Sequence, residues 1–108
     1  MDVTGSRESL EKEIIREMAA SLGRAEDKIN AALLRLDLAG RALAAALDPT
    51  ARRRCAVAFN VEREHALTAR WELMIQREAI GLHRNELLDR LYPIPPRAAV
   101  DPSEAPPT

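Results

Sequence analysis

The sequence predicts an all-α protein, built as a long antiparallel helical hairpin followed by a short third helix. Two observations support this fold class. Ala and Leu dominate an apolar fraction of 46% while aromatic residues make up only 3%, a composition that favours helices. Two long proline-free stretches flank the turn signal Leu47-Asp48-Pro49-Thr50. The 108 residues suit a single domain.

The first long helix is expected over residues 7–46, after a flexible N-terminal arm over residues 1–6. Ser6 is a suitable N-cap, and Glu8 lies in the first turn, where the helix dipole favours a negative charge. Gly23 offers an alternative break. A packed helix tolerates one glycine at a cost of about 1 kcal/mol, so we expect the helix to continue.

The second long helix begins at Asp48-Pro49, because aspartate is a good N-cap and proline suits the first helical position. It can run to the residue before Gly81, which offers a left-handed conformation to end it. A short third helix over residues 85–91 completes a hairpin domain that spans residues 7–92. Residues 93–108 are rich in proline and poor in bulky apolar groups, so we expect a disordered tail there.

A heptad repeat runs through the first helix, with large residues at one seam position and mainly alanine at the other. Five heptads in phase indicate coiled-coil packing at close distance against another helix. A cofactor groove is the alternative interpretation. The large position holds Ile15, Leu22, Ile29, Leu36 and Leu43, and the other holds Met18, Ala25, Ala32, Ala39 and Ala46.

The second helix is apolar on two opposite faces, which is typical of a helix covered on both sides. The first helix covers only one of them. The simplest cover for the other is a second copy, so we predict a homodimer in which two hairpins form a four-helix bundle. A different helical protein is the alternative partner. One face holds Val57, Val61, Leu67, Trp71, Met74 and Ile75, and the other holds Cys55, Ala58, Phe59, Ala66, Ala69, Leu73 and Ile80.

Which of these faces forms the dimer seam stays open. The candidate interface residues are Phe59, Ala66, Ala69, Leu73 and Ile80 on one face and Trp71 on the other.

Glu62 and His65 are the candidate metal ligands. They stand three residues apart, the Glu-x-x-His spacing with which helical bundles hold two iron ions. Iron or another divalent ion is the metal that this pair would bind. The alternative is that Glu62 pairs with an arginine at a helix edge while His65 is solvated.

Two further glutamates, Glu64 and Glu78, share a helix face with Trp71. We expect each to be paired by an arginine across the helices, supplied by Arg16 or Arg24, because a guanidinium binds a carboxylate in a bidentate geometry.

Composition argues against several functional classes. The chain has 16 basic and 17 acidic residues and no basic excess beyond Arg52-Arg53-Arg54, so we expect no nucleic-acid partner. No apolar run approaches the roughly 20 residues of a membrane span, and no signal peptide is visible. Cys55 is the single cysteine and fits a reducing compartment, so we expect a cytoplasmic protein. No catalytic triad, phosphate loop or cysteine-rich zinc pattern is present, which favours a non-enzymatic role without a cofactor.

Two stretches carry a first resemblance. LGRA at residues 22–25 and QREAIGL at residues 76–82 resemble a family of small bacterial all-helical proteins of unknown function, over about residues 10–95. This resemblance implies a helical fold but no activity.

A second resemblance is that of Asp48-Pro49 followed by EREHA at residues 62–66, which is similar to the second helix of encapsulated ferritin. That family is a helical hairpin that dimerises around a di-iron ferroxidase site. The resemblance implies that Glu62 and His65 are iron ligands. The family also takes a glutamate from the first helix near residues 31 or 32, where this chain has two alanines.

From these observations we predict a non-enzymatic helical interaction or scaffold protein that self-associates. The alternative is a ferritin-like metal-binding dimer, with a ferroxidase or divalent-metal site that uses Glu62 and His65. A third ligand from the first helix, facing Glu62, is the feature that separates the two.

Overall fold

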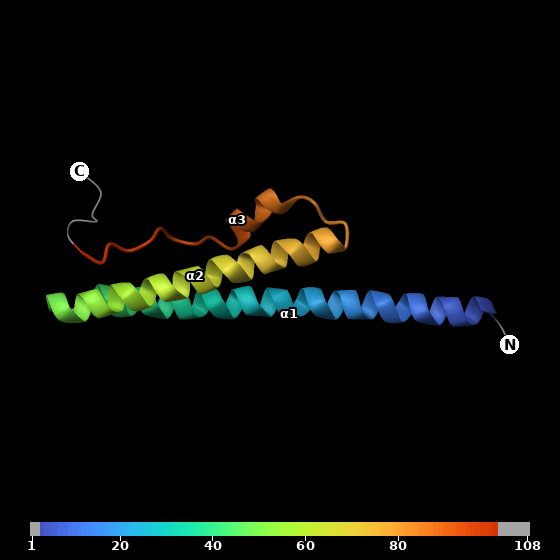
Figure 1. Cartoon of the computed structure of the whole chain (residues 1–108), viewed down its shortest axis with the longest axis horizontal. Coiled ribbons are helices and arrows are strands. Elements are labelled where there is room, and N and C mark those ends of the chain that lie inside the picture. The colour runs from blue at the N-terminus through green and yellow to red at the C-terminus, as the bar shows by residue number, and fades with distance from the viewer. Residues whose placement is uncertain (1–2, 102–108) are drawn as a thin grey trace.

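A computed structural model describes residues 3–101 and shows an all-α hairpin (Figure 1). Helix α1 spans Val3–Ala45 and helix α2 spans Pro49–Ala79, and the two pack antiparallel. A short 3-10 turn, η1 (Asn85–Leu87), leads into α3 (Leu88–Leu91). The predicted fold class is therefore confirmed.

Helix α1 begins earlier than the sequence predicted. Residues 3–6 are helical rather than part of a flexible arm, while residues 1–2 lie outside the described part of the chain. Ser6 therefore lies inside the helix and does not cap it. The helix also continues through Gly23, as expected for a glycine whose cost is offset by packing on either side.

The ends of α2 agree with the prediction. Asp48 is the N-cap, and its Oδ1 accepts a hydrogen bond from the backbone N–H of Ala51 at 2.8 Å. Pro49 occupies the first turn, where a missing N–H costs nothing. Gly81 follows the helix with a φ of 88°, a left-handed value that glycine adopts without strain.

The core lies in the seam between α1 and α2, where the heptad of α1 is buried. Ile29 and Leu73 are its largest fully buried side chains. The alanines at the other heptad position let the helix axes come close together. The buried residues are Ala25, Ile29, Ala32 and Leu36 of α1, Ala56, Phe59, Ala66, Ala69 and Leu73 of α2, and Leu88 of α3.

Helix α1 is longer than α2, with 43 residues against 31. Ser21 donates to Gln76 at 2.9 Å, so α2 is already near its C-terminal end when it passes residue 21 of α1. Every residue from 5 to 20 is exposed, and Figure 1 shows this blue part of α1 continuing beyond the end of α2. We call residues 5–20 the α1 extension. The first two heptad residues, Ile15 and Met18, lie in it and have no cover within the described chain.

Residues 93–101 run back along α2, whereas the sequence predicted a disordered tail over residues 93–108 (Figure 1). Side chains of α2 bind the backbone of this segment and of Tyr92, the residue before it. The Arg70 Nη1 donates to the carbonyl of Tyr92 at 3.0 Å, and the Arg63 Nε donates to the carbonyl of Pro95 at 2.7 Å. Residues 102–108 lie outside the described part.

Asn60 makes a reciprocal pair with the backbone of Ala98. Its Nδ2 donates to the carbonyl at 2.9 Å, and its Oδ1 accepts from the N–H at 2.8 Å. Three residues further on, Asp101 forms an ion pair with Arg53 at 3.0 Å. The bound positions in the segment recur every third residue, which is the period of an extended polyproline-type chain. We call residues 93–101 the proline segment.

Candidate functional site

The two predicted metal ligands lie at an edge of the hairpin. The Glu62 Oε2 is 3.4 Å from His65 Nδ1 and 3.4 Å from the Nε of Arg35 on α1. Both distances are long for hydrogen bonds, so these are weak contacts. The His65 side chain is 59% exposed. Glu62 thus has an interhelical arginine neighbour and a mostly solvated histidine beside it.

A divalent ion at Glu62 would need ligands beyond this pair. Helix α1 places Arg35 beside the carboxylate, and a guanidinium there repels a metal cation. Among residues 3–101, no three His, Cys, Asp or Glu side chains gather closely enough to hold a metal ion. Glu62 and His65 therefore supply two ligands of a possible site, and the remaining ligands would have to come from another chain.

The other glutamates are not paired as expected. Glu64 contacts its neighbour Arg63 at 3.5 Å, and Glu78 accepts a hydrogen bond from Asn85 at 3.0 Å. Neither contact involves Arg16 or Arg24. The expectation failed because both glutamates lie away from the seam with α1.

Most of the predicted interface residues lie inside the hairpin. Helix α1 covers the face of α2 that carries Ala66 and Ala69, because these small side chains permit a close approach. Ile80 is half-buried at the C-cap of α2, and Trp71 is 58% exposed. The buried members are Phe59, Ala66, Ala69 and Leu73, so these four pack within one chain and Trp71 marks the face that stays open.

That open face forms a regular stripe along α2, which we call the α2 outer face. Its residues follow one another in alternating steps of four and three, the spacing of a coiled-coil seam. Val57 is 47% exposed, Val61 48% and Ile75 41%, so the apolar members are available for contact. The α2 outer face consists of Val57, Val61, Glu64, Thr68, Trp71 and Ile75.

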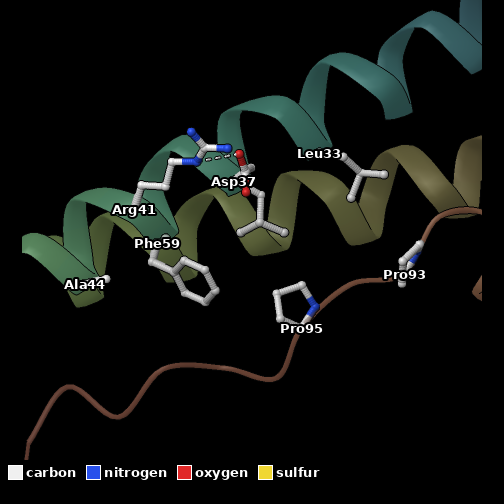
Figure 2. Close-up of a pocket in the computed structure, with 9 residues that line it drawn as sticks. Leu33, Asp37, Arg41, Ala44, Phe59, Pro93 and Pro95 are labelled. Atoms are coloured by element: carbon white, nitrogen blue, oxygen red, sulfur yellow. Dashed lines mark ion pairs between the residues drawn. The ribbon is translucent and has the colours of Figure 1, made fainter.

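A cavity of about 550 Å³ lies between α1, α2 and the proline segment (Figure 2). The ring of Phe59 and the ring of Pro95 face the same space, and Gly40 leaves room beside Phe59. Its two charged lining residues, Asp37 and Arg41, form an ion pair at 3.0 Å. The other lining residues are apolar, so the walls of the cavity offer mainly apolar contact.

Comparison with models of protein families finds no match to this chain, and searches of curated proteins and of solved structures find none either. Within residues 3–101, no helix has both the length and the apolar character needed to cross a membrane.

Sequence reasoning missed the role of the polar row on α2 that holds the proline segment. No role was predicted for Arg63 and Arg70 from the sequence. The signal that could have found this role is the coincidence of Asn60, Arg63 and Arg70 on one side of a helix with a proline-rich segment nearby in sequence. These side chains hold the backbone of the segment, and Ile94 and Ala98 also pack against the core.

Proposed function

We propose that this chain is a non-enzymatic helical interaction protein that self-associates through the α2 outer face. The observation that carries the proposal is the stripe itself. It presents four large apolar side chains at the spacing of a helix seam, each at least 41% exposed. Exposed apolar surface of this kind is typical of a protein contact site.

The α2 outer face is complementary to itself when reversed. In an antiparallel pairing of two copies, the apolar residues at one end meet those at the other, so Val61 lies opposite Trp71 of the second copy. Glu64 then lies opposite Thr68, whose hydroxyl can donate a hydrogen bond to the carboxylate. A parallel pairing would bring two Glu64 side chains together, which like charge disfavours. The stripe therefore supports a two-fold, antiparallel seam.

The surface area of the chain also supports self-association. The chain exposes 8059 Å², whereas a compact monomer of 12.0 kDa exposes about 6,000 Å². Its radius of gyration is 20.2 Å, against about 13 Å for a compact chain of this length. The surplus of roughly 2,000 Å² is of the size that stable subunit interfaces bury. Two hairpins joined along α2 would form an assembly of four long helices.

Sedimentation velocity tests this proposal on the full chain. We expect the double variant Val61→Lys with Trp71→Ser to lose the contact through the α2 outer face and so to form a smaller assembly than the wild type at micromolar concentration. Both residues are exposed, so the hairpin itself should keep its helicity. The matched control changes Leu34→Lys and Leu38→Ser on the opposite side of α1, where both leucines are also exposed. A monomeric wild type, or loss of association in the control alone, would overturn the proposal.

A ferritin-like metal site is the second candidate function. The single observation in its favour is the approach of His65 to Glu62 at 3.4 Å. Addition of Fe(II) in air tests it, and we expect oxidation no faster than in buffer, because Arg35 adjoins the carboxylate. Rapid oxidation that is lost in Glu62→Ala and in His65→Ala would establish the metal site instead.

A further inference from the structure

The α1 extension carries an apolar stripe that nothing in the described chain covers. Leu10 is 57% exposed, Ile14 46%, Ile15 65% and Met18 37%. Met18 is seven residues before the buried Ala25, and Ile15 is fourteen before the buried Ile29. These side chains therefore lie on the side of α1 that faces α2 further along the helix.

The stripe indicates what kind of element would cover it. Helix α2 runs antiparallel to α1 and ends near residue 21 of α1, where Gln76 accepts a hydrogen bond from Ser21. A cover for the α1 extension must continue the line of α2 and must itself present apolar residues at helical spacing. A projecting helical segment of about 16 residues is only marginally stable in water, so such a cover would also stabilise it.

We propose that the α1 extension pairs antiparallel with the α1 extension of a second copy, an inference that rests on the proposed self-association and adds a second seam to it. One antiparallel register brings apolar residues together at its centre and opposite charges together at its ends. When Leu10 lies opposite Ile14 of the second copy, Arg7 lies opposite Glu17. The same register sets Glu8 at the level of Arg16.

Charge also selects the direction of the two helices. A parallel, in-register pair would place Glu11 beside Glu11 and Arg7 beside Arg7 at the edge of the apolar stripe, and like charges oppose such pairing. The antiparallel register instead sets Arg7 opposite Glu17 and Glu8 opposite Arg16, while Glu11 meets Glu13 and Lys12 meets its own copy, so attractive pairs outnumber repulsive ones. Charge therefore favours the antiparallel arrangement of two copies over the parallel one.

The two seams are separate on the chain, because the α2 outer face points away from α1 while the stripe of the α1 extension points toward the α2 side. A chain with two different two-fold seams forms a closed tetramer or a linear array rather than stopping at a dimer. The proposal thus gives the interaction protein the connectivity of a scaffold.

Four full-length chains test the second seam by sedimentation: the wild type, Leu10→Lys with Ile14→Lys, Val61→Lys with Trp71→Ser, and the combination of all four changes. The helix propensity of lysine is close to that of leucine and higher than that of isoleucine, so the helicity of the chain should persist. We expect the wild type to exceed twice its chain mass of 12.0 kDa, each double variant to stop at a dimer, and the combination to be monomeric.

The outcomes separate this inference from the proposed function. If the Leu10→Lys, Ile14→Lys chain assembles like the wild type, the second seam is wrong and the α2 outer face still stands. If only the Val61→Lys, Trp71→Ser chain assembles like the wild type, the α2 outer face is wrong and the second seam stands. A monomeric wild type overturns both seams. The stripe of the α1 extension would then serve a helix of another protein.

Charge reversal tests the register. Arg7→Glu alone should weaken association of the extension by about tenfold at low salt, because two symmetry-related ion pairs become repulsions. Adding Glu17→Arg to the same chain should restore it, since each new glutamate then lies opposite a new arginine. Failure of the double reversal to restore association would rule out the antiparallel register.

Discussion

Replacing Asn60 by alanine should release the proline segment from α2 without unfolding the hairpin. Asn60 makes two hydrogen bonds to Ala98, at 2.9 and 2.8 Å, and both groups are half-buried. Each such bond contributes on the order of 1 kcal/mol, so the change should favour local opening by about 2 kcal/mol. Alanine is also a better helix former than asparagine, so the long helices should not be weakened.

Trypsin reports this opening, because the peptide bond after Arg97 lies next to the Asn60 contact. When opening is fast compared with cleavage, the rate follows the open population, and about 2 kcal/mol corresponds to roughly 30-fold faster cleavage at this bond. Mass spectrometry of the released C-terminal peptide gives the rate. Asn30→Ala, at an exposed asparagine of α1, is the matched control and should cleave like the wild type.

Two results would refute this reasoning. One is cleavage after Arg97 in the native wild type at the rate of the urea-unfolded chain, which would mean that the proline segment is not held. The other is an Asn60→Ala rate equal to that of Asn30→Ala, which would mean that the reciprocal hydrogen bonds do not hold it.

The remaining predictions concern the free energy of unfolding, measured by urea titration of helical circular dichroism. Leu73→Ala should lower it by about 3 kcal/mol, because the side chain is only 1% exposed and leaves a cavity; a loss under 1 kcal/mol would contradict the described core. Gly40→Ala and Gly23→Ala should each raise it by up to about 1 kcal/mol through helix propensity. The added methyl at position 40 would lie 3.5 Å from the ring of Phe59, an ordinary contact distance. If Gly40→Ala lowers the free energy of unfolding while Gly23→Ala raises it, the ring of Phe59 lies closer to position 40 than described. Asp48→Ala should cost about 1 kcal/mol through loss of the N-cap, with Asp48→Asn nearly neutral, and equal losses in the two would point to another role for the charge.

The long helices could be predicted because their signals are local and redundant. Asp48, Pro49 and Gly81 each have one favoured position at a helix end, and all three occupy it. The heptad of α1 repeats often enough to identify the seam that buries Ile29 and Leu36. Propensity, capping and periodicity agree along these segments, so no tertiary information was needed.

The candidate surfaces depended on geometry that the sequence leaves open. Helix α2 has two apolar faces, and periodicity alone cannot decide which of them α1 covers. The small Ala66 and Ala69 decide it, because they let the helices approach, and the face of Trp71 is left outside. The sequence also does not show where along α1 the contact with α2 ends, because the heptad continues to Ile15 although α2 has already ended there.

The proline segment was mispredicted for a different reason. Apolar periods of two and 3.6 residues were the signals for ordered structure, and an extended segment held by its backbone shows neither. Asn60, Arg63 and Arg70, which lie more than 20 residues away in sequence, bind its backbone, and Ile94 packs against a core that the other helices form.

Acrylamide quenching of tryptophan fluorescence, followed over a range of protein concentrations, tests the self-association at the α2 outer face most directly. Trp71 is the single tryptophan of the chain and is 58% exposed in one copy, so it is an internal probe at the centre of the proposed contact. If two copies pair through this face, quenching should fall and the emission should shift to shorter wavelength as the concentration rises from nanomolar to tens of micromolar. Quenching that stays at the level of an exposed tryptophan over the whole range would contradict the account.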